Sequence, residues 1–210
     1  MIPKILHQVW VGGNPLPERE IEWIQSWKKL HPDWNYILWT KKNIQQLEMS
    51  ENSLEAIKNA EGVYACQADI IRYWAVRRHG GFYVDTDVEC FKSIENLRQK
   101  EKDIMLLRPH RGNWLTNAFF GSTKDHEFLK DLTTEIKSPI KQIVQDRKCY
   151  LWGPSYLTRQ WKKHTQSSDS KCIEDCIDES SMILSYDFWS NKNPDSYCKH
   201  YFNASWLKKN

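Results

Sequence analysis

The chain has 210 residues, of which 40% are hydrophobic and 27% are charged, and its formal net charge is +3. This composition is typical of a folded globular protein and excludes an intrinsically disordered or collagen-like chain. The basic residues are scattered rather than gathered into one patch, so the sequence gives no sign of nucleic-acid binding. The length is that of one domain, and we expect residues 1–210 to fold together.

We expect neither a secretion signal nor a membrane span. The first residues lead directly into a strand-like segment, and no apolar run approaches the roughly 20 residues that cross a bilayer. A cytoplasmic protein is therefore expected, with a charge balance compatible with peripheral binding to the cytosolic face of a membrane. Its thiols are expected to be reduced, at Cys66, Cys90, Cys149, Cys172, Cys176 and Cys198. A zinc site from Cys172, Cys176 and His164 is not favoured, because the spacing matches no standard zinc motif.

Strand and helix patterns alternate in the first 60 residues. A buried strand is predicted over residues 2–10, and a Gly-Gly-Asn-Pro turn follows it. Apolar residues spaced three apart predict an amphipathic helix over 17–30, and a second strand is predicted over 35–39. The polar segment 43–60 is predicted to be a surface helix. This alternation of strands and helices extends over the first 125 residues and indicates an α/β fold with a mainly parallel sheet.

The most informative motif is the run Gly-Gly-Phe-Tyr-Val-Asp-Thr-Asp at residues 80–87. Helical spacing predicts a helix over 64–79, and Gly80 then stands where a left-handed C-terminal cap is expected. A short strand follows and ends in Asp85 and Asp87. Alternate residues of an extended segment point to the same side, so these two carboxylates are expected to converge on one divalent cation.

Two carboxylates in a D-x-D pattern are a weak signal when they stand alone. Aspartate is common in solvated turns, which is the alternative interpretation. The preceding helix carries Asp69 and Arg72, which share a helix face because they are three residues apart. This context favours a metal site over a turn, although Asp69 and Arg72 are also compatible with a surface ion pair of little energetic value.

Later segments are predicted with less detail. Strands are expected over 104–107 and 117–121, and a helix over 125–136. Residues 162–181 are rich in Ser, Lys, Asp and Glu and are expected to form a surface insertion.

Several motifs, in this order, resemble glycosyltransferase family 32, which includes capsular-polysaccharide sugar transferases and yeast-type mannosyltransferases. The pattern is also similar to that of the glucosylating clostridial toxins. The motifs are Ile-Pro-Lys-Ile-Leu-His-Gln-Val-Trp at 2–10, Trp27, Pro-Asp-Trp-Asn-Tyr-Ile-Leu-Trp at 32–39, Ala-Asp-Ile-Ile-Arg-Tyr at 68–73, the run 80–87, Leu-Thr-Asn-Ala-Phe-Phe-Gly at 115–121, Gly153-Pro154 with Thr158, and His200 followed by Ser205-Trp206. Residues 126–148 and 162–196 contribute little to this resemblance.

The resemblance implies a GT-A type nucleotide-diphospho-sugar transferase fold, an α/β architecture with a mixed, mainly parallel sheet flanked by helices. Within the single domain, it implies a donor- and metal-binding core at 1–125. Residues 126–196 would form the acceptor side with an insertion, and 197–210 a C-terminal tail that returns to the site.

The resemblance also implies roles for individual residues. Asp85, Asp87 and His200 would bind Mn²⁺ or Mg²⁺, and imidazole suits manganese better than magnesium. The catalytic set would be Asp85, Asp87, Asn117 and Arg72. The donor would contact Val9, Trp10, Asp69, Arg72, Tyr83, Thr86, Ser205 and Trp206. The family's second histidine in the C-terminal motif is replaced here by Tyr201, which leaves open how the tail folds over the donor.

Each of these residues also has a structural interpretation. Trp10 is compatible with core packing at a strand end, and Tyr83 with a buried position in a strand. Asn117 is compatible with a turn, and a lone histidine such as His200 is often incidental. Trp114 and Trp152 are equally compatible with sugar platforms on the acceptor side and with core packing.

The expected activity is that of a metal-dependent retaining glycosyltransferase. It would move a sugar from a nucleotide-diphosphate sugar, with a UDP-sugar preferred and GDP-mannose as the second choice, to a glycan or lipid-linked acceptor. Three alternatives remain open: a sugar- or nucleotide-sugar-binding protein with a degenerate site, a protein-glycosylating effector, and a hydrolase that uses the two aspartates as acid and base. Glycosidase carboxylates flank a bond from opposite sides, which disfavours the hydrolase. The sequence does not indicate an oligomeric state.

Overall fold

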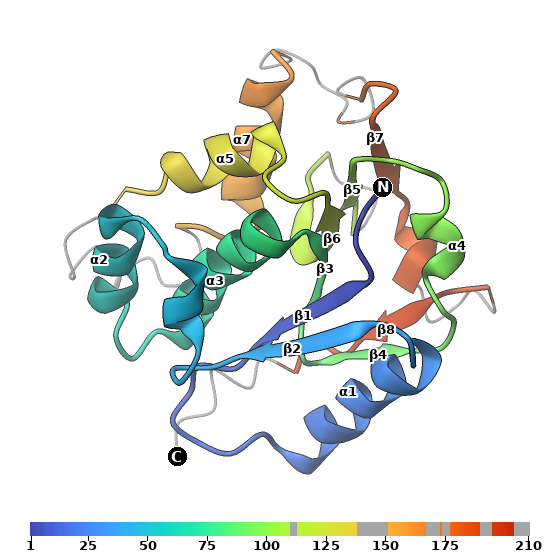
Figure 1. The fold of residues 1–210 in the computed structure, drawn as a ribbon, viewed down its shortest axis with the longest axis horizontal. Helices are drawn as coiled ribbons and strands as arrows, with labels where there is room; N and C mark the ends of the chain where they lie inside the picture. The colour runs from blue at the N-terminus through green and yellow to red at the C-terminus, as the bar shows by residue number, and fades with distance from the viewer. Residues whose placement is uncertain (110–112, 138–150, 167–172, 174–176, 190–194, 204–210) are drawn as a thin grey trace.

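A computed structural model describes most of the chain, namely residues 1–109, 113–137, 151–166, 173, 177–189 and 195–203. Its centre is a six-stranded sheet in the order β2-β1-β3-β6-β5-β7 (Figure 1). The strands are β1 (Ile5–Val9), β2 (Asn35–Trp39), β3 (Gly81–Val84), β5 (Ile104–Leu107), β6 (Thr116–Ser122) and β7 (Ser181–Leu184). A separate two-stranded sheet pairs β4 (Val88–Cys90) with β8 (Cys198–His200).

The main sheet is mixed and mainly parallel. Strand β1 runs parallel to β2 and β3, and β5 runs parallel to β7. Strand β6 is antiparallel to both of its neighbours, β3 and β5. The predicted α/β class with a mainly parallel sheet is therefore confirmed.

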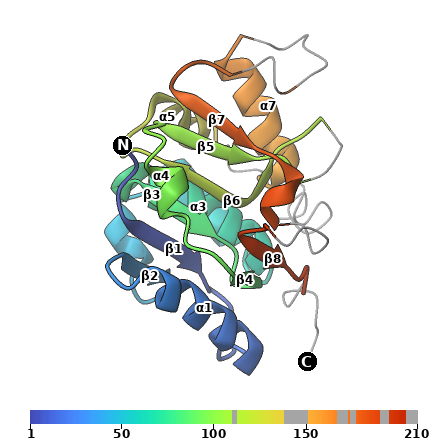
Figure 2. The same ribbon diagram turned by 90° about the vertical axis from the view of Figure 1, so that its right-hand side faces the viewer.

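Helices cover both faces of this sheet (Figure 2). Helices α3, α5 and α7 pack side by side on one face, while α1 lies on the other face against β4. The helices of the described residues are α1 (Glu18–Leu30), α2 (Glu51–Asn59), α3 (Tyr64–His79), α4 (Glu95–Arg98), α5 (Glu127–Thr134) and α7 (Pro154–His164). None of them is long and apolar enough to cross a bilayer.

The sheet separates two hydrophobic cores because side chains of a strand alternate between its faces. In β3, Phe82 and Val84 point into the core beneath α1, whereas Tyr83 points into the core beneath α3. The side chains of β5 alternate between the same two cores. The side chain of Asp85, two residues after Tyr83, therefore leaves the strand on the α3 side.

Gly80 and Gly81, at the start of β3, are both required by close packing. A Cβ atom at Gly81 would lie 2.5 Å from the carbonyl oxygen of Ile5, and one at Gly80 would lie 2.8 Å from the backbone nitrogen of Lys124. Gly80 has a φ of 66°, as expected of a cap, but its ψ of −171° takes it out of the left-handed helical region. The chain therefore turns directly from α3 into the strand instead of making a left-handed helical cap.

Some predicted elements differ from the structure. The helix predicted over 43–60 is two shorter pieces, a 3₁₀ helix Ile44–Leu47 and α2, separated by Glu48 with a φ of 45°. In α1 the apolar residues spaced three apart do not all face inward, because Ile21 is exposed, and Trp23, which is outside that spacing, is buried. The strand predicted over 2–10 is shorter, since Trp10 lies beyond the end of β1.

Most of the C-terminal third was not predicted. The sequence did not indicate α7, β7 or the strand pair β4–β8, and parts of the predicted insertion at 162–181 lie outside the described residues. The zinc alternative cannot be located either, because Cys172 and Cys176 also lie outside them. Within the described residues, Cys66, Cys90 and Cys198 are all buried.

Candidate active site

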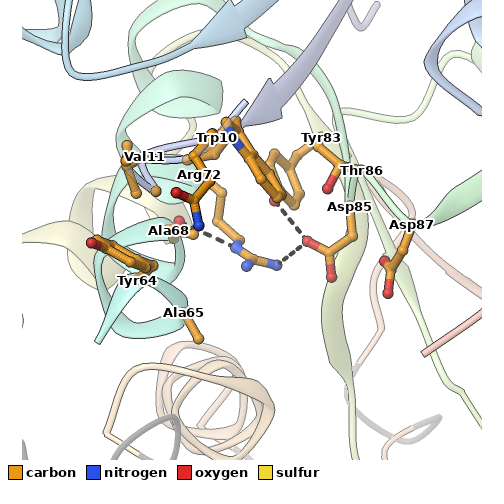
Figure 3. Close-up of a pocket in the computed structure, with 14 residues that line it drawn as sticks. Trp10, Val11, Tyr64, Ala65, Ala68, Arg72, Tyr83, Asp85, Thr86 and Asp87 are labelled. Carbon is orange, nitrogen blue, oxygen red and sulfur yellow. Dashed lines mark hydrogen bonds and ion pairs between the residues drawn. The ribbon is translucent and has the colours of Figure 1, made fainter. Parts of the chain in front are cut away.

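A pocket opens where β1 and β3 end next to each other (Figure 3). One wall is the loop after β1, a second is the first half of α3, and the third is the end of β3 with the D-x-D motif. This edge is where ligands bind in open α/β sheets, because loops diverge beyond the carboxyl ends of the strands. The lining residues are Val9, Trp10, Val11, Gly12, Gly13, Asn14, Tyr64, Ala65, Ala68, Arg72, Tyr83, Asp85, Thr86 and Asp87.

Asp85 is held in place from several sides. Its Oδ1 accepts a hydrogen bond from the Tyr83 hydroxyl at 2.7 Å and contacts Arg72 Nη1 at 2.8 Å (Figure 3). Its backbone N–H donates to the carbonyl of Ala118, and its own carbonyl accepts from the Gln8 side chain. These partners fix the carboxylate with Oδ1 turned toward α3, and the Tyr83 hydroxyl is already engaged by this contact.

Arg72 connects the D-x-D motif to α3. Its guanidinium lies 3.1 Å from Asp69 Oδ1, donates to the carbonyl oxygen of Asn117 at 2.8 Å, and stacks 4.5 Å from the ring centroid of Tyr83. The side chains of Arg72 and Asp69 are each only 7% exposed. The surface ion-pair interpretation is therefore wrong. Buried charges persist only where several partners satisfy them, as these do.

Asn117 holds the other side of this network. It lies in β6 rather than in a turn, and its side-chain amide donates to Asp69 Oδ1 at 2.7 Å and to the Tyr73 hydroxyl at 3.1 Å. Tyr73 in turn donates to the carbonyl of Trp152, at the approach to α7. A polar chain thus runs from β6 through α3 to α7, and Trp152 packs in the core.

The C-terminal strand β8 carries His200 to Asp87. Nε2 of His200 lies 3.1 Å from Oδ1 of Asp87, and the backbone N–H of Asn203 donates to Oδ2 of the same carboxylate at 2.9 Å. The backbone N–H of Tyr201 donates to the Asp87 carbonyl. These contacts therefore join the D-x-D motif to residues 200–203, at the end of the described chain.

Asp85, Asp87 and His200 fit a divalent cation. One ligand atom from each of the three lies within 4.8 Å of the others. Two carboxylate oxygens and an imidazole nitrogen are a donor set that suits Mn²⁺. The Nδ1 atom of His200 is buried and has no hydrogen-bond partner among the described residues, whereas Nε2 faces the Asp87 carboxylate and donates to it.

The electrostatics of the two motif aspartates differ. Burial raises the pKa of Asp85 although Arg72 opposes this. Burial also acts to raise the pKa of Asp87, but the hydrogen bonds from His200 and Asn203 outweigh it and lower the pKa overall. Asp87 is therefore the better-stabilised anion of the pair.

In the ion pair of Asp69 and Arg72, beneath the motif, burial is also opposed by neighbouring charges and hydrogen bonds. Burial raises the pKa of Asp69 to about 6, against the attraction of Arg72 and the hydrogen bond from Asn117. Burial disfavours the charge on Arg72 too, but Asp85, Tyr83 and Asp69 outweigh it and raise its pKa. Arg72 therefore keeps a positive charge at the floor of the pocket.

The structure brings together all but two of the residues predicted for the site. Ser205 and Trp206 lie outside the described residues. Trp10 is half-buried at the pocket, and its indole N–H donates to the Asn14 carbonyl, so core packing does not describe it. Trp114, by contrast, lies away from this pocket and is exposed.

Four further residues of the site were missed. Tyr64 lines the pocket across from Trp10, and Gln8, Tyr73 and Asn203 hold Asp85, Asn117 and Asp87. Gln8 and Tyr73 carried a usable signal. Gln8 is a polar residue in a strand that was predicted to be buried, and Tyr73 lies one helical turn from Asp69. The role of Asn203 depends on its backbone and has no sequence signal.

Residues 17–104 match the family model described as glycosyltransferase sugar-binding region containing DXD motif. The chain is 32% identical over 212 residues to inositol phosphoceramide mannosyltransferase 1 of Schizosaccharomyces pombe, covering 98% of this chain and 62% of that protein. It is 30% identical over 178 residues to inositol phosphoceramide mannosyltransferase 3 of the same yeast, covering 81% of this chain and 48% of that protein. The chain thus spans about half to three fifths of the length of these two curated relatives.

The fold has a counterpart among solved structures. The PaToxG glycosyltransferase superposes with a TM-score of 0.66 at 20% identity, covering 83% of this chain and 74% of that one. The predicted GT-A type fold is thereby confirmed. The family match, the curated relatives and the D-x-D pair at the end of β3 together identify residues 17–104 as a glycosyltransferase sugar-binding region that contains the DXD motif.

Proposed function

We propose that the protein is a metal-dependent glycosyltransferase that takes its sugar from a nucleotide-diphosphate donor. One observation carries this proposal: the ligand atoms of Asp85, Asp87 and His200 converge within 4.8 Å at the rim of a pocket that also contains Arg72. A cation site next to a fixed guanidinium is suited to a diphosphate, because both neutralise charge on the leaving group.

The pocket suggests how the donor would lie. Trp10 and Tyr64 stand on two walls of its outer part, where an aromatic face can stack on a nucleobase. Val9 and the Gly12-Gly13 turn let the backbone approach a ligand closely. The diphosphate would then lie toward the D-x-D motif, with the sugar over Arg72 and the network of Asp69 and Asn117 beneath it.

The D-x-D motif and His200 would hold Mn²⁺ or Mg²⁺, and the ion, when bound, would supply positive charge to the departing diphosphate. Asp87 would be the principal ligand, because its hydrogen bonds keep it ionised. Asp85 would contribute Oδ2, since Oδ1 is engaged by Arg72 and Tyr83. Arg72 remains charged and would orient the donor with the one Nη2–H that its contacts with Ala68, Asp69, Asp85 and Asn117 leave available.

We propose that transfer retains the anomeric configuration. Within the described residues, the carboxylates of the pocket all lie on the D-x-D side or in ion pairs, so no second carboxylate faces the donor from the opposite wall. The acceptor hydroxyl would approach from the leaving-group side, and the departing phosphate oxygen would take its proton. This route requires no enzymatic nucleophile.

The curated relatives bear mannosyltransferase names, which favours GDP-mannose as the first donor to test. UDP-sugars are the second group. The acceptor would be a hydroxyl of a glycan or of a lipid-linked saccharide, at the cytosolic face of a membrane.

The test is a donor screen in two stages. Purified protein is melted with GDP-mannose, UDP-glucose and UDP-N-acetylglucosamine, each with and without Mn²⁺, and the stabilising donor is then assayed for sugar transfer to candidate acceptors. We expect stabilisation by one donor only when Mn²⁺ is present, followed by transfer that exceeds hydrolysis. Donor binding that is indifferent to Mn²⁺ and gives no transfer would instead indicate a sugar-nucleotide-binding protein.

A further inference from the structure

Two buried cysteines face each other next to the proposed metal site without taking part in its chemistry. Strands β4 and β8 are antiparallel, and their register places Cys90 directly opposite Cys198. Figure 2 shows the two strands side by side at the edge of the molecule. Both side chains belong to the same hydrophobic core, so they leave the strand pair on the same face.

The hydrogen bonds of this ladder decide how close the two cysteines are. The backbone N–H of Phe91 donates to the carbonyl of Tyr197 at 2.8 Å, which makes these two a hydrogen-bonded pair. Hydrogen-bonded and non-hydrogen-bonded pairs alternate along an antiparallel ladder. The adjacent pair, Cys90 and Cys198, is therefore non-hydrogen-bonded. Cα atoms of such pairs are about 4.5 Å apart, within the span of roughly 4.4–6.8 Å that a disulfide bridges.

We propose that Cys90 and Cys198 form a reversible disulfide when the protein meets a small-molecule disulfide such as oxidised glutathione. The Cys90 thiolate attacks one sulfur of oxidised glutathione, breaks its S–S bond, and releases one glutathione thiolate. The Cys198 thiolate then attacks the Cys90 sulfur of this mixed disulfide and releases the second. Each released thiolate takes up one of the protons lost by the two cysteines, so the protein is oxidised by two electrons while one glutathione disulfide becomes two thiols.

The closed structure protects both thiols from this reaction. Cys90 is 4% exposed and Cys198 is fully buried. Burial also raises the pKa of Cys90 to about 12, which disfavours its thiolate form. Reaction therefore requires the strand pair to open. Opening separates two strands of only three residues each, and it exposes the part of the core that Cys90 and Cys198 occupy.

The position of the bond links it to the proposed metal site. Cys198 stands two residues before His200 on β8, and Cys90 stands three residues after Asp87. A covalent bond between the two strands would hold His200 against Asp87 even when β8 would otherwise separate from β4. We therefore expect the oxidised protein to bind Mn²⁺ severalfold more tightly than the reduced protein, and this second expectation rests on the proposed function.

The experiment incubates the full chain with oxidised glutathione and follows free thiols, intact mass and disulfide-mapped peptides. We expect the wild type to lose two thiols, to lose the mass of two hydrogens, and to yield a peptide that joins Cys90 to Cys198. Cys90→Ser and Cys198→Ser should each fail to form it. Cys66→Ser is the matched control, because Cys66 is equally buried but belongs to the other core, and it should behave as the wild type does.

The oxidised protein should melt several degrees higher than the reduced one, and this difference should vanish in Cys198→Ser. Should either serine variant fold poorly, peptide mapping of the wild type alone still decides the matter. The proposal is overturned when the mapped link joins other cysteines, or when Cys90 and Cys198 remain free thiols at a glutathione ratio that oxidises them in a denatured sample. A mapped link with unchanged Mn²⁺ affinity would retain the disulfide and reject only its connection to the metal site.

Discussion

Nη1 of Arg72 lies 2.8 Å from Oδ1 of Asp85 and also donates a hydrogen bond to the carbonyl of Asn117. One guanidinium group thereby joins the middle of α3 to the ends of two adjacent, antiparallel strands, β3 and β6. Asp69 contacts the same group from the preceding turn of the helix. The arginine is therefore both part of the support of the site and a charge at its floor.

We predict that Arg72→Lys lowers transfer activity by about 100-fold, because an ammonium cannot contact Asp69, Asp85 and the Asn117 carbonyl together. Arg72→Gln should in addition lower the free energy of unfolding by about 3 kcal/mol, since it leaves two buried carboxylates without their cation. Steady-state kinetics and urea unfolding measure the two effects. Arg19→Lys, in α1, is the control and should change neither. A lysine variant with wild-type kcat would contradict the proposed role.

Asp87→Asn should abolish Mn²⁺-dependent stabilisation by the donor and reduce turnover by at least about 100-fold. The amide keeps the size of the side chain but loses the negative charge that His200 and Asn203 help to maintain. Differential scanning fluorimetry with a Mn²⁺ titration, followed by kinetics, measures this. Asp33→Asn, an exposed carboxylate distant in the fold, is the matched charge control. Unaltered Mn²⁺ dependence in Asp87→Asn would remove this residue from the metal site.

Trp10→Ala should raise the donor KM about tenfold and leave kcat within about threefold, because stacking on a base stabilises ground state and transition state alike. Trp10→Phe should recover most of the affinity. The comparison needs initial rates over a range of donor concentrations, with the nucleotide diphosphate as a competitive inhibitor. Loss of kcat with an unchanged KM would instead place Trp10 nearer the reacting sugar.

The stability of the fold should fall in weak acid because of His7. Its Nε2–H donates to the Gly80 carbonyl at 2.7 Å and its Nδ1 accepts from the Trp39 indole at 3.1 Å, so both ring nitrogens are used by the neutral form. Complete burial lowers the pKa of His7 from 6.5 to about 4. The unfolded chain therefore binds more protons between these values, and stability falls as pH decreases through this window, by about 3 kcal/mol in total.

The test is urea unfolding of the wild type and His7→Gln at pH 7, 6, 5 and 4.5. Glutamine can donate to Gly80 and accept from Trp39 without titrating, so the variant should lose stability less steeply as the pH falls. The difference between the two proteins isolates His7 from the carboxylates that both share. Parallel curves would show that His7 does not contribute.

Local patterns were sufficient for most of the first 136 residues. The helix predicted over 64–79 coincides with α3, and the strands at 35–39 and 104–107 coincide with β2 and β5. The helix predicted over 43–60 was wrong in its continuity because Glu48 adopts a positive φ, for which the sequence carries no glycine or proline signal. The C-terminal third lacked strong periodicity, and its short strands exist only through pairing with distant segments.

The amino-acid sequence by itself determined the α/β class, the D-x-D pair on one side of a strand end, and the family. The first two depend on periodicity and on spacing between near neighbours, which the backbone geometry of helices and strands makes readable, and the family rests on the resemblance of whole motifs. Only the tertiary structure decided that Arg72 spans Asp69, Asp85 and Asn117, that Asn203 closes on Asp87, and that Cys90 faces Cys198. Apart from the Asp69–Arg72 pair, these contacts join residues from 13 to 116 positions apart, and their distances follow from how the whole chain packs rather than from any local pattern.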